Sequence, residues 1–278
     1  MTDTSHTGDT AVRTAELLPA MTARIVERFH PVQVILFGSW ARGDARARSD
    51  VDFLVVLPRV DDKRQATFDI RDALRDFDVA KDVVVTTPEE IVRRGNLVGD
   101  VLRAALREGQ VLYDAERDGD FGPRSLRSDV ALRWEPRAVT DEERVAETWK
   151  WLRQAREELR SAEKLATDED PGPHVACYLS QQAAEKALKA VLIFLQIDYP
   201  LTHNLDEIRE SIPEGWLLKG EHPDLEVLSG WAVKARYPGD WPEATELDGR
   251  NAARQARAVY ESVLNDLEAR GFEVGALR

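Results

Sequence analysis

The stretch that decides the fold reads VQVILFGSWARGDARARSDVDFLVVL and covers residues 32–57. It begins and ends with apolar, β-branched runs, 32–37 and 51–57, of the kind that form buried strands. Gly38-Ser39 ends the first run, and a loop rich in arginine follows it. The second run opens on two aspartates one residue apart. The stretch therefore predicts two core strands joined by a polar segment that carries charges of both signs.

The segments around this stretch alternate between helical and strand patterns. The expected elements are helices at 11–30, 62–77, from Pro88 onward and at 97–108, and strands at 82–87 and 110–114. This alternation is typical of an α/β domain, here over residues 11–115, with helices flanking a mixed sheet. We expect the polar residues 1–10 to be disordered.

The character of the chain changes after this domain. Residues 116–139 are charged, contain glycine and proline and show no clear period, so we interpret them as a linker. Strand signals almost vanish beyond it, and residues 140–278 are expected to form an all-α antiparallel bundle. Its helices are expected at 141–166, 174–196, 204–212, 223–235 and 245–269.

Composition excludes several classes of protein. The net charge of −13 and the pI of about 5.0 argue against charge-driven binding to nucleic acid in general or to an anionic membrane. Cys177 is the single cysteine, which excludes an intrachain disulfide and makes a cysteine-based zinc site improbable. The polar N-terminal residues lack the pattern of a signal peptide, and no stretch is long and apolar enough to span a membrane. We therefore expect a cytoplasmic protein.

The two aspartates suggest a metal site. Asp50 and Asp52 stand at i and i+2 at the start of a strand, so both side chains project from the same face. Asp82 opens the next strand, and it joins them if the two strands are neighbours; Asp78 is its rival for this position. Such carboxylates are good ligands for Mg²⁺, and three of them can hold two ions. Taken alone, an Asp-x-Asp is more often a solvated strand edge.

The residues before these aspartates are suited to phosphate. Gly38 allows main-chain N–H groups to approach a phosphate closely, and the Ser39 hydroxyl adds a donor. Arg42, Arg46 and Arg48 then place positive charge near the same point. Each feature alone has an ordinary explanation as a turn or a solvated surface, but together they predict a site for a metal-bound triphosphate.

The order of these residues resembles a known family. GSWARGDARARSDVDFLVV, residues 38–56, is similar to the minimal nucleotidyltransferases of the DNA polymerase beta superfamily. The resemblance implies that Gly38, Ser39, Arg42 and Ser49 bind the nucleotide. It further implies that Asp50, Asp52 and Asp82 bind two Mg²⁺ ions, with Asp82 also placed to act as general base. Members of this family transfer a nucleoside monophosphate, often AMP from ATP, to a hydroxyl group.

A second resemblance covers about residues 141–270. The stretches ACYLSQQAAEKALKAVLIFLQIDYPLTHNLDEI, 176–208, and ARYPGDW, 235–241, resemble the HEPN domain, which is often encoded beside minimal nucleotidyltransferases as a toxin beside its antitoxin. Many HEPN domains are ribonucleases that use an arginine and a histidine separated by four to six residues. Here Arg250 is followed at those positions by Gln255, Ala256 and Arg257, so the general acid–base of a ribonuclease is missing.

Two interpretations of the late helix remain open. Arg250, Arg254 and Arg257 recur at helical spacing and could form a phosphate-binding face. Alternatively, they form a solvated face on which Arg250 pairs with Glu246 and Arg257 with Glu261, at i and i+4. The second interpretation is favoured, because such charged helix faces are common.

We therefore expect a Mg²⁺-dependent enzyme that transfers AMP from ATP to a hydroxyl of a protein or small molecule, with the helical domain as acceptor-binding or regulatory partner. The alternatives are a toxin–antitoxin-type regulatory module and a small-molecule enzyme of the aminoglycoside-modifying kind. A ribonuclease is the least favoured, and binding of RNA is left open. The expected partners are a nucleotide, an acceptor and, through the HEPN-like helices, a second copy of the chain, with no membrane.

Overall fold

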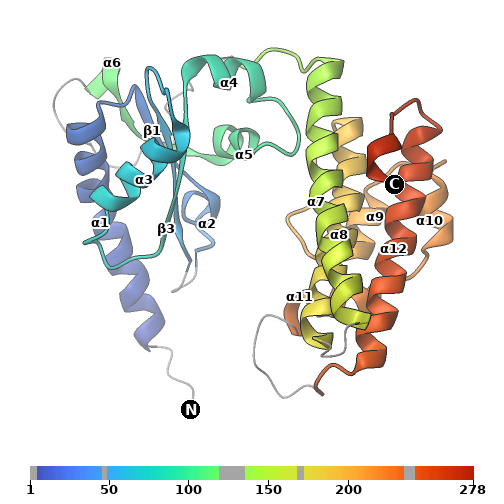
Figure 1. Cartoon of the computed structure of the whole chain (residues 1–278). Helices are drawn as coiled ribbons and strands as arrows, with labels where there is room; N and C mark the ends of the chain where they lie inside the picture. Colours follow the sequence, from blue (N-terminus) through green and yellow to red (C-terminus); the bar gives the residue numbers. More distant parts are fainter. Residues whose placement is uncertain (1–4, 46–48, 119–134, 168–171, 235–241) are drawn as a thin grey trace. The chain divides into compact units, whose positions relative to one another are not determined.

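The computed structural model describes residues 5–45, 49–118, 135–167, 172–234 and 242–278. The chain divides into two compact units, Met1–Val139 and Thr140–Arg278 (Figure 1). In the described residues, no helix combines the length and apolar character needed to cross a membrane.

The first unit is an α/β domain. Its elements are α1 (Ser5–Phe29), β1 (Gln33–Phe37), α2 (Gly38–Arg42), β2 (Val51–Val56), α3 (Lys63–Ala73), β3 (Lys81–Thr86), α4 (Pro88–Arg94), α5 (Val101–Glu108), β4 (Gln110–Asp114) and α6 (Ala115–Asp118). The sheet has the order β3-β2-β1-β4. β1 is antiparallel to both β2 and β4, whereas β2 and β3 are parallel, so the mixed sheet expected from the sequence is confirmed.

Each face of the sheet carries its own apolar core, because side chains alternate along a strand. On one face, Phe53 and Val55 of β2 pack with Ile70 of α3 and Ile25 of α1. On the other face, the alternating residues of β2 and β1 pack with Ile91 of α4 and with Leu102 and Leu106 of α5. Figure 1 shows α1 and α3 on one side of the sheet and α4 and α5 on the other.

Three boundaries differ from the sequence prediction. The first helix begins at Ser5, so it includes residues 5–10, for which we expected disorder, and it contains Pro19. Residues 38–42 form a helical turn where we expected the start of a loop. The predicted linker, 116–139, has structure at both ends: residues 116–118 belong to α6, and the Asn96 amide donates to the carbonyls of Pro136 and Arg137.

The second unit is a bundle around one central helix. Its elements are α7 (Asp141–Thr167), α8 (Pro173–Leu195), α9 (Leu205–Glu210), α10 (Leu217–Glu221), α11 (Glu226–Lys234), α12 (Glu246–Glu268) and the 3-10 turn η1 (Gly275–Leu277). α8 packs against both α7 and α12. Small residues such as Ala183, Ala184 and Ala187 are fully buried on α8, and they let its neighbours approach closely on both sides. The expected all-α bundle is confirmed.

The helix α10, which the sequence pattern did not predict, depends on a cap from a distant element. The side chain of Asp266 on α12 is buried and accepts from the main-chain N–H groups of Leu217 at 3.1 Å and Leu218 at 2.9 Å. It also pairs with Arg270 at 3.1 Å. The carboxylate therefore satisfies N–H groups at the start of α10 that would otherwise lack partners.

We expect Asp266→Ala to destabilise this unit by about 2–4 kcal/mol, because it removes a buried acceptor and leaves buried N–H groups unpaired. Urea unfolding followed by circular dichroism would measure this loss. Glu268→Ala is the matched control, since Glu268 is exposed and its pairing with Arg278 should contribute less than about 1 kcal/mol. Equal stability of the two variants would contradict the capping role.

Candidate functional site

The carboxylates predicted from the sequence gather at one end of the sheet. Asp52 alternates along β2 with Leu54 and Val56, which belong to the core beneath α4 and α5, so its side chain projects on that face of the sheet. Asp50, two residues earlier, stands where the strand begins. In the parallel ladder, Asp52 lies directly opposite Asp82 of β3. The condition set by the sequence, that the second and third strands are neighbours, is therefore met, and Asp82 rather than Asp78 is the partner in register.

The turn after β1 brings Gly38 against these carboxylates. Phe37 is paired with Asp52 across the β1–β2 ladder, so the next residue lies beside the Asp52 side chain. Gly38 has a φ of +71°, and a Cβ at this position would overlap Asp52 Oδ2. Both the backbone conformation and the close approach therefore require glycine here.

The charge of Asp52 is poorly compensated. Burial, together with the charges of Asp82 and Asp50, raises the pKa of Asp52 from 3.8 to about 6, while the positive charge of Arg42 opposes this rise. Within the described residues, neither Asp50 nor Asp52 forms a hydrogen bond or ion pair. Crowded carboxylates without a cationic partner are the donor set that a divalent cation would stabilise.

Asp82 also pairs with a basic residue outside this cluster. Its carboxylate lies 3.6 Å from the guanidinium of Arg71 on α3, and its side chain is 59% exposed. In the described part of the chain, no three His, Cys, Asp or Glu side chains converge closely enough to bind one ion together. Asp50 and Asp52 therefore fit a metal as the chain stands, and Asp82 would join them by exchanging its exposed pairing with Arg71.

The remaining predicted residues line the turn between β1 and β2. Arg42 pairs with Glu108 of α5 at 2.8 Å, and this hydrogen bond raises the pKa of the guanidinium. Ser39 is half-buried on α2, and its carbonyl accepts from the N–H of Asp44 at 3.1 Å. Ser49 is held through its carbonyl, which accepts from the Trp40 indole at 3.1 Å. Arg46 and Arg48 lie outside the described residues.

Sequence reasoning missed two residues of this site. Trp40 joins the two ends of the turn, and Arg71 neutralises part of the charge of Asp82. An aromatic residue two positions after Gly38 could have drawn attention to Trp40. Arg71 gives no local signal, because it reaches Asp82 from a helix that packs beside the strand.

Comparison with known families agrees with both halves of this architecture. The model of the nucleotidyltransferase domain matches residues 21–112, which include Gly38 and all three aspartates. The model of the HEPN domain matches residues 148–267. The chain is a nucleotidyltransferase–HEPN fusion.

Individual relatives of the fusion add little. No curated protein matches it. Among solved structures it is similar to the crystal structure of TT1696 from Thermus thermophilus, with 27% identity and a TM-score of 0.36. The match covers 43% of the fusion and 97% of the other chain. The name of that protein states no activity.

Two of the three arginines of the late helix, Arg250 and Arg257, form ion pairs, whereas Arg254 donates to the side chain of Asn251. Arg250 pairs with Glu246 at 3.1 Å and Arg257 with Glu261 at 3.9 Å, as the favoured interpretation predicted. Arg257 also makes a bidentate pair with Glu163 of α7, with one contact of 2.7 Å. Ala256 is fully buried. The stretch 235–241, which carries part of the HEPN resemblance, lies outside the described residues.

A polar network lies inside the HEPN domain. Glu185 of α8 is buried and accepts from Lys189 at 2.8 Å, from Gln181 at 2.9 Å and from His203 at 3.0 Å. Burial alone would raise the pKa of Glu185, but these hydrogen bonds outweigh it and lower the pKa. Gln181, Glu185 and Lys189 therefore fasten α8 to the segment before α9, and they do not line an open groove or a solvated helix face.

The raised pKa of Asp52 predicts a stability gain for Asp52→Asn. The folded-state pKa of about 6 exceeds the ordinary 3.8, so the charged carboxylate destabilises the metal-free fold. The penalty is absent below pH 3.8, grows between pH 3.8 and about 6, and is complete above that range. Because Asp52 is half-buried and screened by solvent, we expect a gain of about 1 kcal/mol at pH 7.5 and none at pH 3.5.

Thermal unfolding at both pH values in a chelating buffer would measure this gain. Asp61→Asn is the control, since Asp61 is exposed and pairs with Arg59, outside the site. A gain that is equal at both pH values would show that the charge of Asp52 is not its cause.

Proposed function

We propose that the nucleotidyltransferase domain transfers AMP from ATP to a hydroxyl group of a protein or small molecule and depends on Mg²⁺. The observation that carries this proposal is the register of β2 and β3, in which Asp52 lies opposite Asp82. Asp50 comes two residues before Asp52, where β2 begins. Gly38 lies against the Asp52 carboxylate. Nucleotidyl transfer requires such a combination of a phosphate-binding turn and metal-binding carboxylates.

Each residue has a distinct role in this proposal. Asp50 and Asp52 would hold Mg²⁺, and Asp82 would add a ligand and accept the proton of the attacking hydroxyl. Gly38, Ser39 and Ser49 would position the triphosphate, while Arg42 would offset its charge. When bound, Mg²⁺ supplies charge neutralisation for the triphosphate and lowers the pKa of the attacking hydroxyl.

The proposed reaction needs ATP, the acceptor hydroxyl and a base that takes up the hydroxyl proton. The acceptor oxygen forms a bond to the α-phosphorus of ATP, and the bond from that phosphorus to the oxygen bridging to the β-phosphate breaks. Pyrophosphate leaves with that electron pair, and the hydroxyl proton passes to Asp82. The arginine and carboxylate side chains orient the reactants and form no covalent bond with the phosphate.

Intact-protein mass spectrometry after incubation with Mg·ATP would test the proposal. One or more added AMP groups in the wild type, absent from the Asp50→Ala/Asp52→Ala variant, would support a transferase whose acceptor lies in its own chain. Without added mass, consumption of ATP in a cell lysate supplied with the protein would indicate a separate acceptor. Failure of the purified protein to bind Mg·ATP would overturn the proposal.

A regulatory module of the toxin–antitoxin type is the second candidate. It is favoured by α12, where Arg250 and Arg257 are paired with acids and no histidine follows Arg250. In this alternative the HEPN domain binds a partner and cleaves no RNA. Its cellular effect would then persist when Asp50 and Asp52 are replaced, which distinguishes it from the enzyme.

A further inference from the structure

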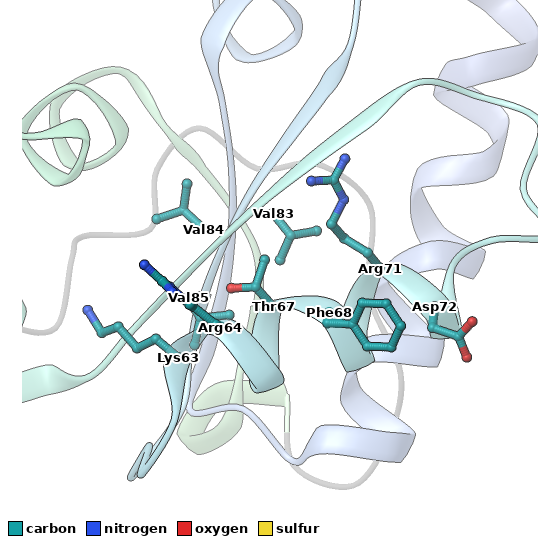
Figure 2. A pocket seen from close by; sticks show the side chains of 9 residues that line it. All are labelled: Lys63, Arg64, Thr67, Phe68, Arg71, Asp72, Val83, Val84 and Val85. Carbon is teal, nitrogen blue, oxygen red and sulfur yellow. The ribbon is translucent and has the colours of Figure 1, made fainter. Parts of the chain in front are cut away.

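A groove of about 730 Å³ lies between α3 and the edge strand β3 (Figure 2). It is lined by Lys63, Arg64, Thr67, Phe68, Arg71, Asp72, Val83, Val84 and Val85. It does not include Gly38, Asp50 or Asp52. Its contact with the candidate site is Arg71, which lines one end and pairs with Asp82.

The apolar surface of the groove comes from two elements. Val83 and Val85 of β3 line the groove together with Phe68 of α3, which is 63% exposed. Figure 2 shows Phe68 on the helix that faces this strand. An exposed aromatic ring beside apolar strand residues is a surface that a partner's apolar side chains could cover.

The open edge of β3 supplies main-chain groups. β3 ends the sheet, so it has a neighbouring strand on one side. The carbonyls of Ala80 and Thr86 accept from β2, and main-chain direction alternates along a strand, so the groups of Val83 and Val85 point to the open edge. An added strand would find partners there.

The charged rim of the groove is predominantly basic. Lys63 and Arg64 lie at one end and Arg71 at the other (Figure 2). In the described residues the Arg64 guanidinium has no acidic partner. Lys63 pairs with the half-buried Glu90, and Arg71 pairs with Asp82 across an exposed surface. The acidic residue in the lining, Asp72, is paired with Arg75. Exposed pairs of this kind exchange readily, so the rim can bind an incoming anion.

We propose that this groove docks an extended, acidic polypeptide segment as an added strand on β3. The proposal rests on the proposed function and names its acceptor class: a protein whose segment runs along β3 would reach Asp82, opposite Asp52, at one end. A six-residue strand spans about 20 Å, so a short segment suffices. A nucleic acid fits less well, because the open edge of β3 offers main-chain strand pairing, which a polypeptide can complete and a nucleic acid cannot.

The test uses the full chain and a fluorescein-labelled peptide of alternating glutamate and valine with one central serine. We expect binding in fluorescence anisotropy and slower hydrogen exchange in the amides of residues 81–86. Arg64→Glu should weaken binding about tenfold, and Phe68→Ala should weaken it as well. Both residues are at the surface, so these variants should fold. Arg59→Glu is the matched control, since Arg59 is exposed and lies outside the groove.

Several results would overturn the proposal. The first is that no binding is detected at about 1 mM peptide, and the second is that Arg64→Glu binds the peptide as tightly as the wild type. The third is that the peptide leaves hydrogen exchange in β3 unchanged. The fourth is that the chain prefers a lysine-containing peptide or a single-stranded oligonucleotide. Binding of Mg·ATP, measured in parallel, separates the two proposals. Loss of the proposed function would leave peptide binding intact, whereas failure of the groove would leave Mg·ATP binding intact.

Discussion

Replacing Asp52 with asparagine is expected to reduce nucleotidyl transfer at least about a thousandfold, which corresponds to about 4 kcal/mol of transition-state stabilisation. Asp52 is the carboxylate with a neighbour on each side in the site. It is in register with Asp82, two residues from Asp50 and against Gly38. Asparagine keeps the shape of the side chain but removes the charge that would hold Mg²⁺. The same substitution is expected to stabilise the metal-free protein, so loss of activity cannot be ascribed to unfolding.

Transfer of label from ATP carrying a radioactive α-phosphate, into the purified protein or into lysate proteins, measures this effect. Asp61→Asn is the matched control, because it removes an exposed carboxylate that pairs with Arg59 outside the site. Retention of more than about a tenth of the activity in Asp52→Asn would show that the metal site lies elsewhere.

The second large effect is expected at Gly38, and the chain offers a close control for it. Gly38 and Gly43 both have left-handed φ angles, +71° and +79°, so alanine strains the backbone at either position. A Cβ on Gly43 meets nothing within 4 Å, whereas one on Gly38 overlaps the Asp52 carboxylate. We expect each alanine variant to lose about 1–2 kcal/mol of stability.

The two variants should differ in activity. Gly38→Ala displaces Asp52, and we expect it to lower nucleotidyl transfer about a hundredfold or more, while Gly43→Ala keeps activity near the wild-type level. Urea unfolding and the labelling assay, run on both variants, would give the two quantities. Equal activities would mean that the contact between Gly38 and Asp52 has no part in the reaction.

The elements that could be predicted from the sequence are those with a strong local pattern. The runs 32–37 and 51–57 became β1 and β2, and helical spacing located α7, α8 and α12. The Asp-x-Asp spacing predicted a shared face because strand geometry has a period of two. The pairing of Asp82 with this face could be stated only as a condition, since strand order is set by packing across the sheet.

The features that escaped prediction depend on residues far apart in the chain. α10 lacks a local capping residue, and its N–H groups are satisfied from α12. Arg71 reaches Asp82 from α3, and the groove combines that helix with a strand edge. No period or motif in a single stretch carries such contacts, which arise when elements pack.

The distant cap on α10 also has a consequence for the order of folding. Asp266 follows Leu218 by 48 residues, so the carboxylate that completes this helix is made long after the helix itself. During synthesis the segment 217–221 can gain its full stability only when α12 has left the ribosome and docked. Closing so long a loop carries an entropic cost that local helix formation does not. In kinetic terms, α10 therefore belongs to the late-forming part of the bundle, and its amides should be among the last to gain protection in a refolding experiment.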